Sequence, residues 1–315
     1  MMRFVWNLCK TLCLCLVLLL GATGLYAGNM AYDEIFNAPW DKILGIENRS
    51  DSLTGIHARE ERQGWERVGV TADDGTALAG TFIEDANPER PTVILLHGMY
   101  QNRSMSIPYA RLYRNMGYNV LLADLRGHGE SGGKITDWGV HGVEDIQSWV
   151  NFIHARRPDS PIGLHGISLG AASALIYLGS EEGQKLAFCI SDSAYGNLLE
   201  LGRNKLKLFS SDERLIFGMD LLNPFFQAAL FYHTGRWLSD IDPVDTVPRA
   251  RVPVLFIHGG KDMLIPADTC RELANAAGSS DKEVHIFEGA THANALAASP
   301  KEYQSVIARF LQALA

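Results

Sequence analysis

The stretch Gly166-Ile167-Ser168-Leu169-Gly170 decides the fold that we expect for this chain. It follows an apolar run at 161–164 and precedes a helix of small residues at 171–178, so a buried strand would turn into a helix at Ser168. Such a turn strains the serine backbone and leaves room only for glycine at 166 and 170. The Ser168 hydroxyl would then stand clear of the sheet, beside the free N–H groups of a helix N-terminus. A Gly-x-Ser-x-Gly pattern also arises by chance, so the rest of the chain has to support this interpretation.

The remainder of the chain alternates between apolar runs and helical segments. Six runs have the length and residue types of buried strands, at 92–96, 119–123, 161–164, 186–190, 253–257 and 283–287. Between them lie segments such as 143–155, whose apolar residues recur at helical spacing, and we expect a closing helix from Ala295 to Leu314. Upstream, Asp73-Asp74-Gly75 separates two β-rich runs at 65–71 and 78–83, which predicts an antiparallel hairpin. We therefore expect an α/β fold with a mostly parallel, doubly wound sheet and an antiparallel N-terminal hairpin.

Polar residues stand just after these expected strands. In chain order they are His97-Gly98-Met99, the loop from Asp124 to Ser131, Ser168, Asp192, Asp262 and His292. The carboxyl ends of parallel strands meet at one edge of the sheet, which is where such folds bind ligands. This edge is the expected site.

Composition excludes several other classes of function. The net charge is −8 and no run of Lys and Arg is present, which argues against a nucleic-acid surface. No phosphate-binding loop or spaced set of metal ligands is found, so we expect neither a cofactor nor a metal. Cys189 falls on an expected strand and Cys270 on an expected helix, and we interpret both as buried free thiols; the alternative is a disulfide between them in an oxidising compartment.

The N-terminus differs in kind from the remainder. Arg3 and Lys10 precede an apolar stretch, so residues 1–27 are expected to be an export signal or a single membrane anchor. In either case the basic residues stay on the cytoplasmic side and the rest of the chain becomes extracytoplasmic, whether periplasmic, membrane-anchored or secreted. Residues 28–64 are expected to form a short, partly helical connector to a domain at 65–315.

One insertion, at about 195–248, breaks the alternation between the fourth and fifth parallel strands. Its apolar residues suggest helices that cover the mouth of the sheet as a lid; the alternative is a helical subdomain with its own small core. These residues are Leu198, Leu199, Leu206, Leu208, Phe209, Leu221, Leu222, Phe225, Phe226, Leu230 and Phe231.

Five ordered motifs make the chain resemble the α/β-hydrolase fold family over about residues 65–315. They are His97-Gly98, Asp124-x-Arg-Gly-His-Gly-x-Ser131, the turn at 166–170, the run 252–262 that ends in Gly-Gly-Lys-Asp262, and Gly289-Ala-Thr-His292. A narrower likeness, to membrane-anchored bacterial hydrolases with a short helical lid, is carried by Arg126-Gly-His-Gly-Glu-Ser-Gly-Gly-Lys134 and Asp242-Pro-Val-Asp245.

The resemblance implies a catalytic triad in the chain order Ser168, Asp262, His292. A serine hydroxyl needs a base, for which His292 is the candidate, and Asp262 would hold the tautomer of His292. Asp192 is the alternative acid. The backbone N–H groups of Met99 and Leu169 would form the oxyanion hole.

The same resemblance makes the loop at 124–131 chiefly structural, with His97 bonded to backbone inside its turn. For Arg103 we expect solvent exposure rather than contact with an acidic leaving group.

These features predict a serine hydrolase that cleaves a small-molecule ester or thioester through an acyl-enzyme, without a cofactor. The apolar insertion favours an apolar acyl group. A peptidase or an acyltransferase would use the same triad, and a non-catalytic envelope binding protein would retain the same fold.

Overall fold

The fold is seen in a computed structural model that describes residues 2–84, 87, 89–133 and 137–314. Lys134 lies outside the described residues, and so do the side chains of Leu208 and Phe209. Eight strands form one sheet in the order β1-β2-β4-β3-β5-β6-β7-β8. Their bounds are β1 Glu66–Thr71, β2 Ala77–Ile83, β3 Thr92–Leu96, β4 Asn119–Ala123, β5 Ile162–Ile167, β6 Phe188–Asp192, β7 Val254–Gly259 and β8 Lys282–Phe287.

The predicted sheet is confirmed. Strands β1 and β2 pair antiparallel around the Asp-Gly turn, and β2 pairs antiparallel with β4. All pairs from β4 through β8 are parallel. Each of the six expected apolar runs forms one parallel strand, and the strands β3 to β7 are buried along their whole length.

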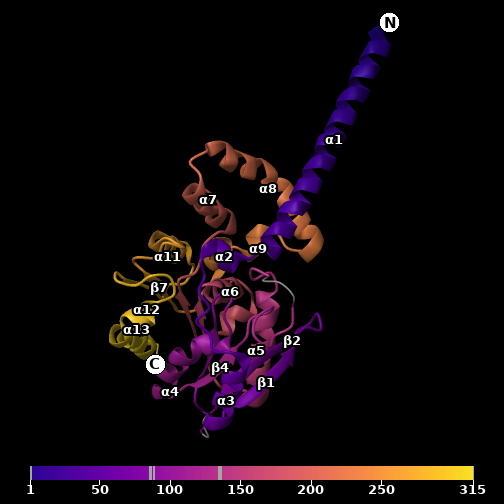
Figure 1. Cartoon of the computed structure of the whole chain (residues 1–315). Coiled ribbons are helices and arrows are strands. Elements are labelled where there is room, and N and C mark those ends of the chain that lie inside the picture. Colours follow the sequence, from indigo (N-terminus) through magenta and orange to yellow (C-terminus); the bar gives the residue numbers. More distant parts are fainter. Residues whose placement is uncertain (1, 85–86, 88, 134–136, 315) are drawn as a thin grey trace. The chain divides into compact units, whose positions relative to one another are not determined.

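Helices connect the strands and cover the sheet (Figure 1). The longer ones are α4 Ile107–Asn115, α5 Gly142–Arg156, α6 Leu169–Leu178, α11 Ala267–Ala276 and α13 Pro300–Ala313. Short helical turns are η1 Arg103–Ser106, η2 Glu182–Lys185, α9 Leu238–Ile241, α10 Pro243–Thr246, η3 Val247–Arg249 and α12 Ala295–Ala298.

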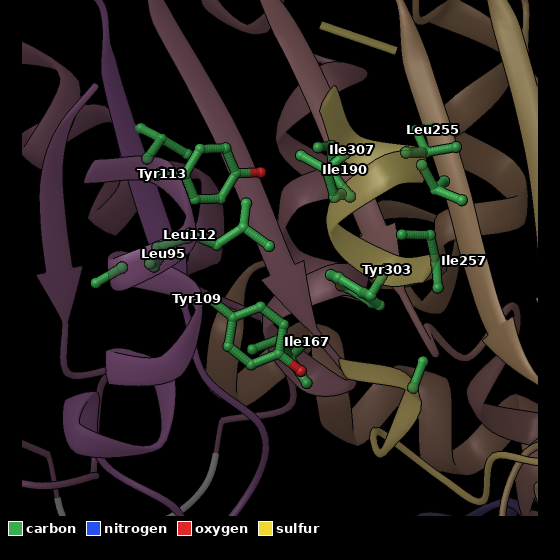
Figure 2. Packing of buried hydrophobic residues seen from close by; sticks show 14 of the residues in the cluster. Leu95, Tyr109, Leu112, Tyr113, Ile167, Ile190, Leu255, Ile257, Tyr303 and Ile307 are labelled. Atoms are coloured by element: carbon green, nitrogen blue, oxygen red, sulfur yellow. The ribbon is translucent and has the colours of Figure 1, made fainter. Parts of the chain in front are cut away.

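The core between the sheet and two of these helices is shown in Figure 2. Tyr109 and Tyr113 of α4 and Tyr303 of α13 are buried against apolar strand residues, among them Ile167 at the end of β5. Burying aliphatic and aromatic side chains of this size is the main source of stability in such a domain. The end of β5, which leads to Ser168, therefore packs against a rigid core.

The C-terminal helix differs from our expectation. We expected one helix from Ala295 to Leu314, but the chain breaks between α12 and α13 at Ser299, where φ is −139° and ψ is 65°. The physical reason is Pro300, whose ring disfavours a helical backbone at the residue before it and which is well tolerated in the first turn of a new helix.

The chain divides into two compact units. One comprises Pro39–Leu201 and Ser239–Ala315; it holds the sheet together with the helices α2 Trp40–Leu44 and α3 Leu53–Gln63. The other comprises Met1–Ala38 and Gly202–Leu238, and it contains α1 Met2–Asn37, most of α7 Leu198–Phe209, and α8 Glu213–Thr234. The expected boundary between residues 27 and 28 falls inside the continuous helix α1. Within the described residues, α1 and α8 are long and apolar enough to cross a membrane.

Candidate active site

Ser168 occupies the apex of the turn between β5 and α6. Its backbone has φ 54° and ψ −114°, a conformation that residues other than glycine rarely adopt and that only a rigid surrounding structure maintains. The glycines are required because a Cβ at Gly166 would collide with the carbonyl of Gly170, and a Cβ at Gly170 would collide with the carbonyls of Leu96 and His97. The Ser168 N–H donates to the Asp192 carbonyl at 2.8 Å, which ties the turn to β6.

The structure brings Ser168, His292 and Asp262 together in one chain of hydrogen bonds. Ser168 Oγ lies 2.8 Å from His292 Nε2, and His292 Nδ1 lies 2.7 Å from Asp262 Oδ2. Because Nδ1–H donates its hydrogen bond to the Asp262 carboxylate, the unprotonated Nε2 is free to accept the serine proton. The His292 side chain is 20% exposed, whereas the Asp262 side chain is fully buried. The geometry is that of a nucleophile, a base and an orienting acid.

Asp262 is held as a carboxylate by its surroundings. Burial alone would raise its pKa, but hydrogen bonds from His258 and His292 outweigh burial, so the pKa of Asp262 is lowered. Backbone N–H groups of Leu264 and Ile265 also donate to Oδ1, each at 2.8 Å. The loop after β7 therefore fixes both the charge and the direction of this side chain.

Asp192, the alternative acid, has other hydrogen-bond partners. Ser193 Oγ donates to its Oδ1 at 2.9 Å and Tyr303 OH donates to its Oδ2 at 2.8 Å. Complete burial raises its pKa, the opposite of the shift at Asp262. The described contacts thus join His292 to Asp262 and leave Asp192 within the core between β6 and α13.

The turn at His97-Gly98 lies beside the serine. A Cβ placed on Gly98 would stand 3.4 Å from the Cβ of Ser168, so the backbone of this turn packs against the serine. Within the described part of the chain, neither the Met99 amide nor the Leu169 amide at the start of α6 donates a hydrogen bond. An oxyanion hole requires N–H donors that are free in this way.

His97 holds this turn as a neutral side chain, as we expected. Its Nδ1 lies 2.7 Å from the Gly98 carbonyl, and the Leu125 N–H donates to its Nε2 at 3.0 Å. One ring nitrogen therefore donates and the other accepts. Complete burial lowers the pKa of His97 to about 3, so the ring stays uncharged at neutral pH.

The loop at 124–131 is bonded mainly to its own neighbours, which supports the structural role. Arg126 pairs with Asp145 at 2.6 Å and with Asp74 at 2.7 Å. Ser131 Oγ donates to the Asp124 carbonyl at 2.7 Å and accepts the N–H of Ala79 at 3.0 Å, which fastens the loop to β2.

Our expectation for Arg103 is wrong. Its side chain is only 1% exposed and lies among three carboxylates, Asp124 at 2.5 Å, Glu130 at 2.5 Å and Glu60 at 3.1 Å. A buried guanidinium is tolerated only when such partners satisfy its five N–H donors. Arg103 thus joins α3, the segment after the turn at His97-Gly98 and the loop at 124–131 from inside the protein.

The sequence analysis did not identify the segment from Glu47 to Asp51, which forms hydrogen bonds to both sides of the site. Arg49 contacts both halves of the site: its backbone N–H donates to Gln101 Oε1 at 2.8 Å, and its guanidinium donates to the Ala293 carbonyl, next to His292, at 3.0 Å. Gln101 in turn donates to the Glu47 carbonyl at 2.8 Å. The segment is polar and has no periodicity, so no local pattern could have placed it against residues so distant in the sequence.

The two cysteines of the sheet unit, Cys189 in β6 and Cys270 in α11, are buried free thiols. Burial raises the pKa of Cys270 to about 12, which makes it unreactive at neutral pH. Among the described residues there is no group of three or more His, Cys, Asp or Glu side chains arranged to hold a metal ion.

Comparison with known proteins identifies the family of the chain. Residues 93–304 match the sequence profile described as "Alpha/beta hydrolase family". The uncharacterized protein YqkD of Bacillus subtilis is 29% identical over 221 residues, which is 70% of either chain. Protein bem46 of Schizosaccharomyces pombe is 25% identical over 80% of this chain and 78% of its own. The crystallised esterase Pf2001 of Pyrococcus furiosus superposes with a TM-score of 0.65 and 25% identity, over 80% of this chain and 93% of its own. The chain belongs to the alpha/beta hydrolase family.

Proposed function

We propose that the protein is a serine esterase that acts through an acyl-enzyme on Ser168. The observation that carries the proposal is the continuous chain of hydrogen bonds from Ser168 Oγ through His292 to the buried Asp262 carboxylate. The esterase Pf2001, similar in fold over most of both chains, supports an ester rather than another acyl compound.

In the first step, Ser168 Oγ attacks the ester carbonyl carbon while its proton passes to His292 Nε2. The Asp262 carboxylate stabilises the imidazolium that forms and keeps Nδ1 protonated. The carbonyl oxygen becomes an oxyanion, which the amides of Met99 and Leu169 bind. One such preorganised donor typically lowers the barrier by about 3 kcal/mol.

Collapse of this intermediate expels the alcohol, which takes the proton from His292 and leaves the acyl group on Ser168. Water then attacks the acyl-enzyme, with His292 removing its proton, and the acid is released as Ser168 recovers its hydrogen. His292 carries out every proton transfer, so this mechanism needs neither a cofactor nor a metal.

We also propose that the enzyme works at a membrane, outside the cytoplasm. Helix α1 has an 18-residue window of mean hydropathy 2.1, and Arg3 and Lys10 would stay on the cytoplasmic side. The rest of the chain would then be translocated. The insertion at 195–248 would act as the lid, and its Leu- and Phe-rich composition favours an ester with an apolar acyl group.

A fluorophosphonate probe tests the chemistry directly, because it reacts only with an activated serine. Full-length protein in a non-ionic detergent should be labelled stoichiometrically, and Ser168→Ala should not be labelled. Ser173→Ala is the matched control, since Ser173 is a buried serine of α6 whose Oγ donates to the Leu169 carbonyl. No labelling of well-folded protein would contradict the proposal and favour a binding protein that retains the fold.

After labelling, an acyl-chain series of esters and thioesters would define the substrate. Preference for short or charged acyl groups would contradict the expected apolar substrate. Labelling without hydrolysis of any ester would point to a peptidase or to an acceptor other than water.

A further inference from the structure

The unit formed by α1 and residues 202–238 carries an exposed apolar stripe on α8. Phe217, Leu221 and Phe225 follow one another at intervals of four residues, and Tyr232 lies seven residues further, so all four share one face of the helix. Phe217 is 68% exposed, Leu221 is 62% exposed and Tyr232 is 83% exposed. Large apolar side chains grouped in this way mark an interaction surface.

The fourth member of the stripe, Phe225, packs against α1. A Cβ on Gly24 would collide with the Phe225 ring, and a Cβ on Gly28 would collide with the Phe225 backbone. Two glycines four residues apart on an apolar helix allow this close approach, as they do between helices in membranes. The exposed part of the stripe thus lies on the face of α8 that contacts α1. Figure 1 shows the ribbon of α8 reaching the C-terminal part of α1.

Polar contacts fix the same packing one to two turns further along both helices. His233 Nε2 lies 2.7 Å from Asn29 Oδ1, and the His233 ring stacks on Tyr32 with centroids 4.4 Å apart. Residues 24–32 of α1 therefore contact residues 225–233 of α8, and residue 27, the last residue of the expected export signal, lies within this contact.

The length of the uncharged stretch of α1 indicates at which level of the bilayer α8 contacts α1. No charged residue occurs from 11 to 32, a stretch of about 33 Å in a helix, which matches the hydrocarbon thickness of a bilayer. Residues 24–32 form the distal end of that stretch, so α8 meets α1 near the membrane–water interface. Tyr232 and the 43% exposed Trp237 are residue types that favour this zone.

Charge favours the same placement. Residues 202–238 contain five Lys and Arg against three Asp and Glu, whereas the whole chain has a net charge of −8. Asp220 pairs with Arg203 of α7 at 2.6 Å, so its charge is compensated within the unit. With Arg214, Asp220 and Pro224 inside it, α8 suits the surface of a bilayer better than its interior.

We propose that the stripe of α8 docks on the lipid bilayer that α1 crosses, so that the two helices form one membrane-bound unit and α1 is retained as an anchor. The inference rests on the proposed membrane location of α1, but it concerns binding and does not depend on the proposed esterase chemistry.

The test places an environment-sensitive nitrobenzoxadiazole probe on Leu221→Cys in the full-length chain, after Cys9, Cys13 and Cys15 are changed to Ser. The protein is reconstituted in vesicles of phosphatidylethanolamine and phosphatidylglycerol, with or without doxyl-labelled lipid. Leu53→Cys on α3 is the matched control, because it is also an exposed leucine on a helix but belongs to the other unit.

We expect blue-shifted emission at position 221 that doxyl lipid quenches at least twofold, and unshifted, unquenched emission at position 53. If doxyl lipid leaves the emission at position 221 unchanged, the proposal is overturned. This holds both for unshifted emission, which would place the probe in water, and for blue-shifted emission, which would mean that protein covers it. Should Leu221→Cys fail to fold by circular dichroism, Phe217→Cys serves as the second position under the same criteria. Loss of residues 1–27 from the membrane-extracted protein, seen by mass spectrometry, would equally overturn it.

Discussion

Replacing His165 with glutamine should remove a defined part of the acid sensitivity of this fold. His165 lies on β5, fully buried, between two tyrosines: Nδ1 is 2.9 Å from Tyr113 OH and Nε2 is 3.1 Å from Tyr303 OH. The Tyr303 proton is directed to Asp192, so the oxygen of Tyr303 accepts Nε2–H, and Nδ1 accepts the Tyr113 proton. Glutamine can supply one donor and one acceptor in the same place, but it does not titrate.

The magnitude follows from the pKa of the histidine. Burial lowers the pKa of His165 to about 3 in the folded state, against about 6.5 in the unfolded chain. Because the folded pKa is depressed, the contribution to stability is complete above pH ~6.5 and is lost as the pH falls toward ~3. At pH values well between these two pKa values, unfolding is accompanied by the uptake of one proton at His165. Stability therefore falls by about 1.4 kcal/mol per pH unit, or about 2 kcal/mol between pH 7.5 and 5.

Urea unfolding in a non-ionic detergent, followed by tryptophan fluorescence, measures this difference. Other groups titrate as well, and Asp242, whose pKa burial raises to about 7, acts in the opposite direction, so the comparison between wild type and His165→Gln is the informative quantity. Between pH 7.5 and pH 5, the unfolding free energy of the wild type should fall by about 2 kcal/mol more than that of His165→Gln. With an m-value of about 3 kcal/mol/M, that is a midpoint shift of about 0.7 M urea. Equal pH slopes for the two proteins would refute the reasoning, since they would mean that His165 is not held neutral by burial.

Three substitutions around the site give separate expectations. Asp262→Asn should lower kcat by about 10⁴-fold by analogy with other triads, with little change in KM, whereas Asp192→Asn should chiefly lower the unfolding midpoint; the reverse pattern in ester kinetics would reassign the acid. Arg103→Met should destabilise the fold by about 3–5 kcal/mol, because three carboxylates lose their buried partner, and a urea midpoint equal to that of the wild type would contradict this. Arg49→Gln should lower kcat about tenfold through the lost hydrogen bond to Ala293 while KM stays nearly constant, and an unchanged kcat would mean that the segment at 47–51 does not position the His292 loop.

The fold was predictable because its signals are local. Each parallel strand is a run of apolar residues long enough to be recognised alone, and the turn at 166–170 needs its glycines for a steric reason that any five-residue window contains. The chain order of Ser168, Asp262 and His292 also follows from their positions after strands. A helix break such as that at Ser299 was local too, and Pro300 was the signal that we overlooked.

The remaining features depend on contacts between distant parts of the chain. Arg103 follows the polar residues Gln101 and Asn102 and reads as exposed. Only the convergence of α3, β4 and the loop at 124–131 supplies the carboxylates that bury it. Asp192 and Asp262 both follow strands, and the choice between them rests on which carboxylate the His292 loop reaches in space. Periodicity reports which face of an element is buried, but it carries no information about which side chains meet there. That is why the strands could be predicted from sequence, while the partners of Arg49 and Arg103, and the choice of Asp262 over Asp192 as the neighbour of His292, became clear only from the tertiary structure.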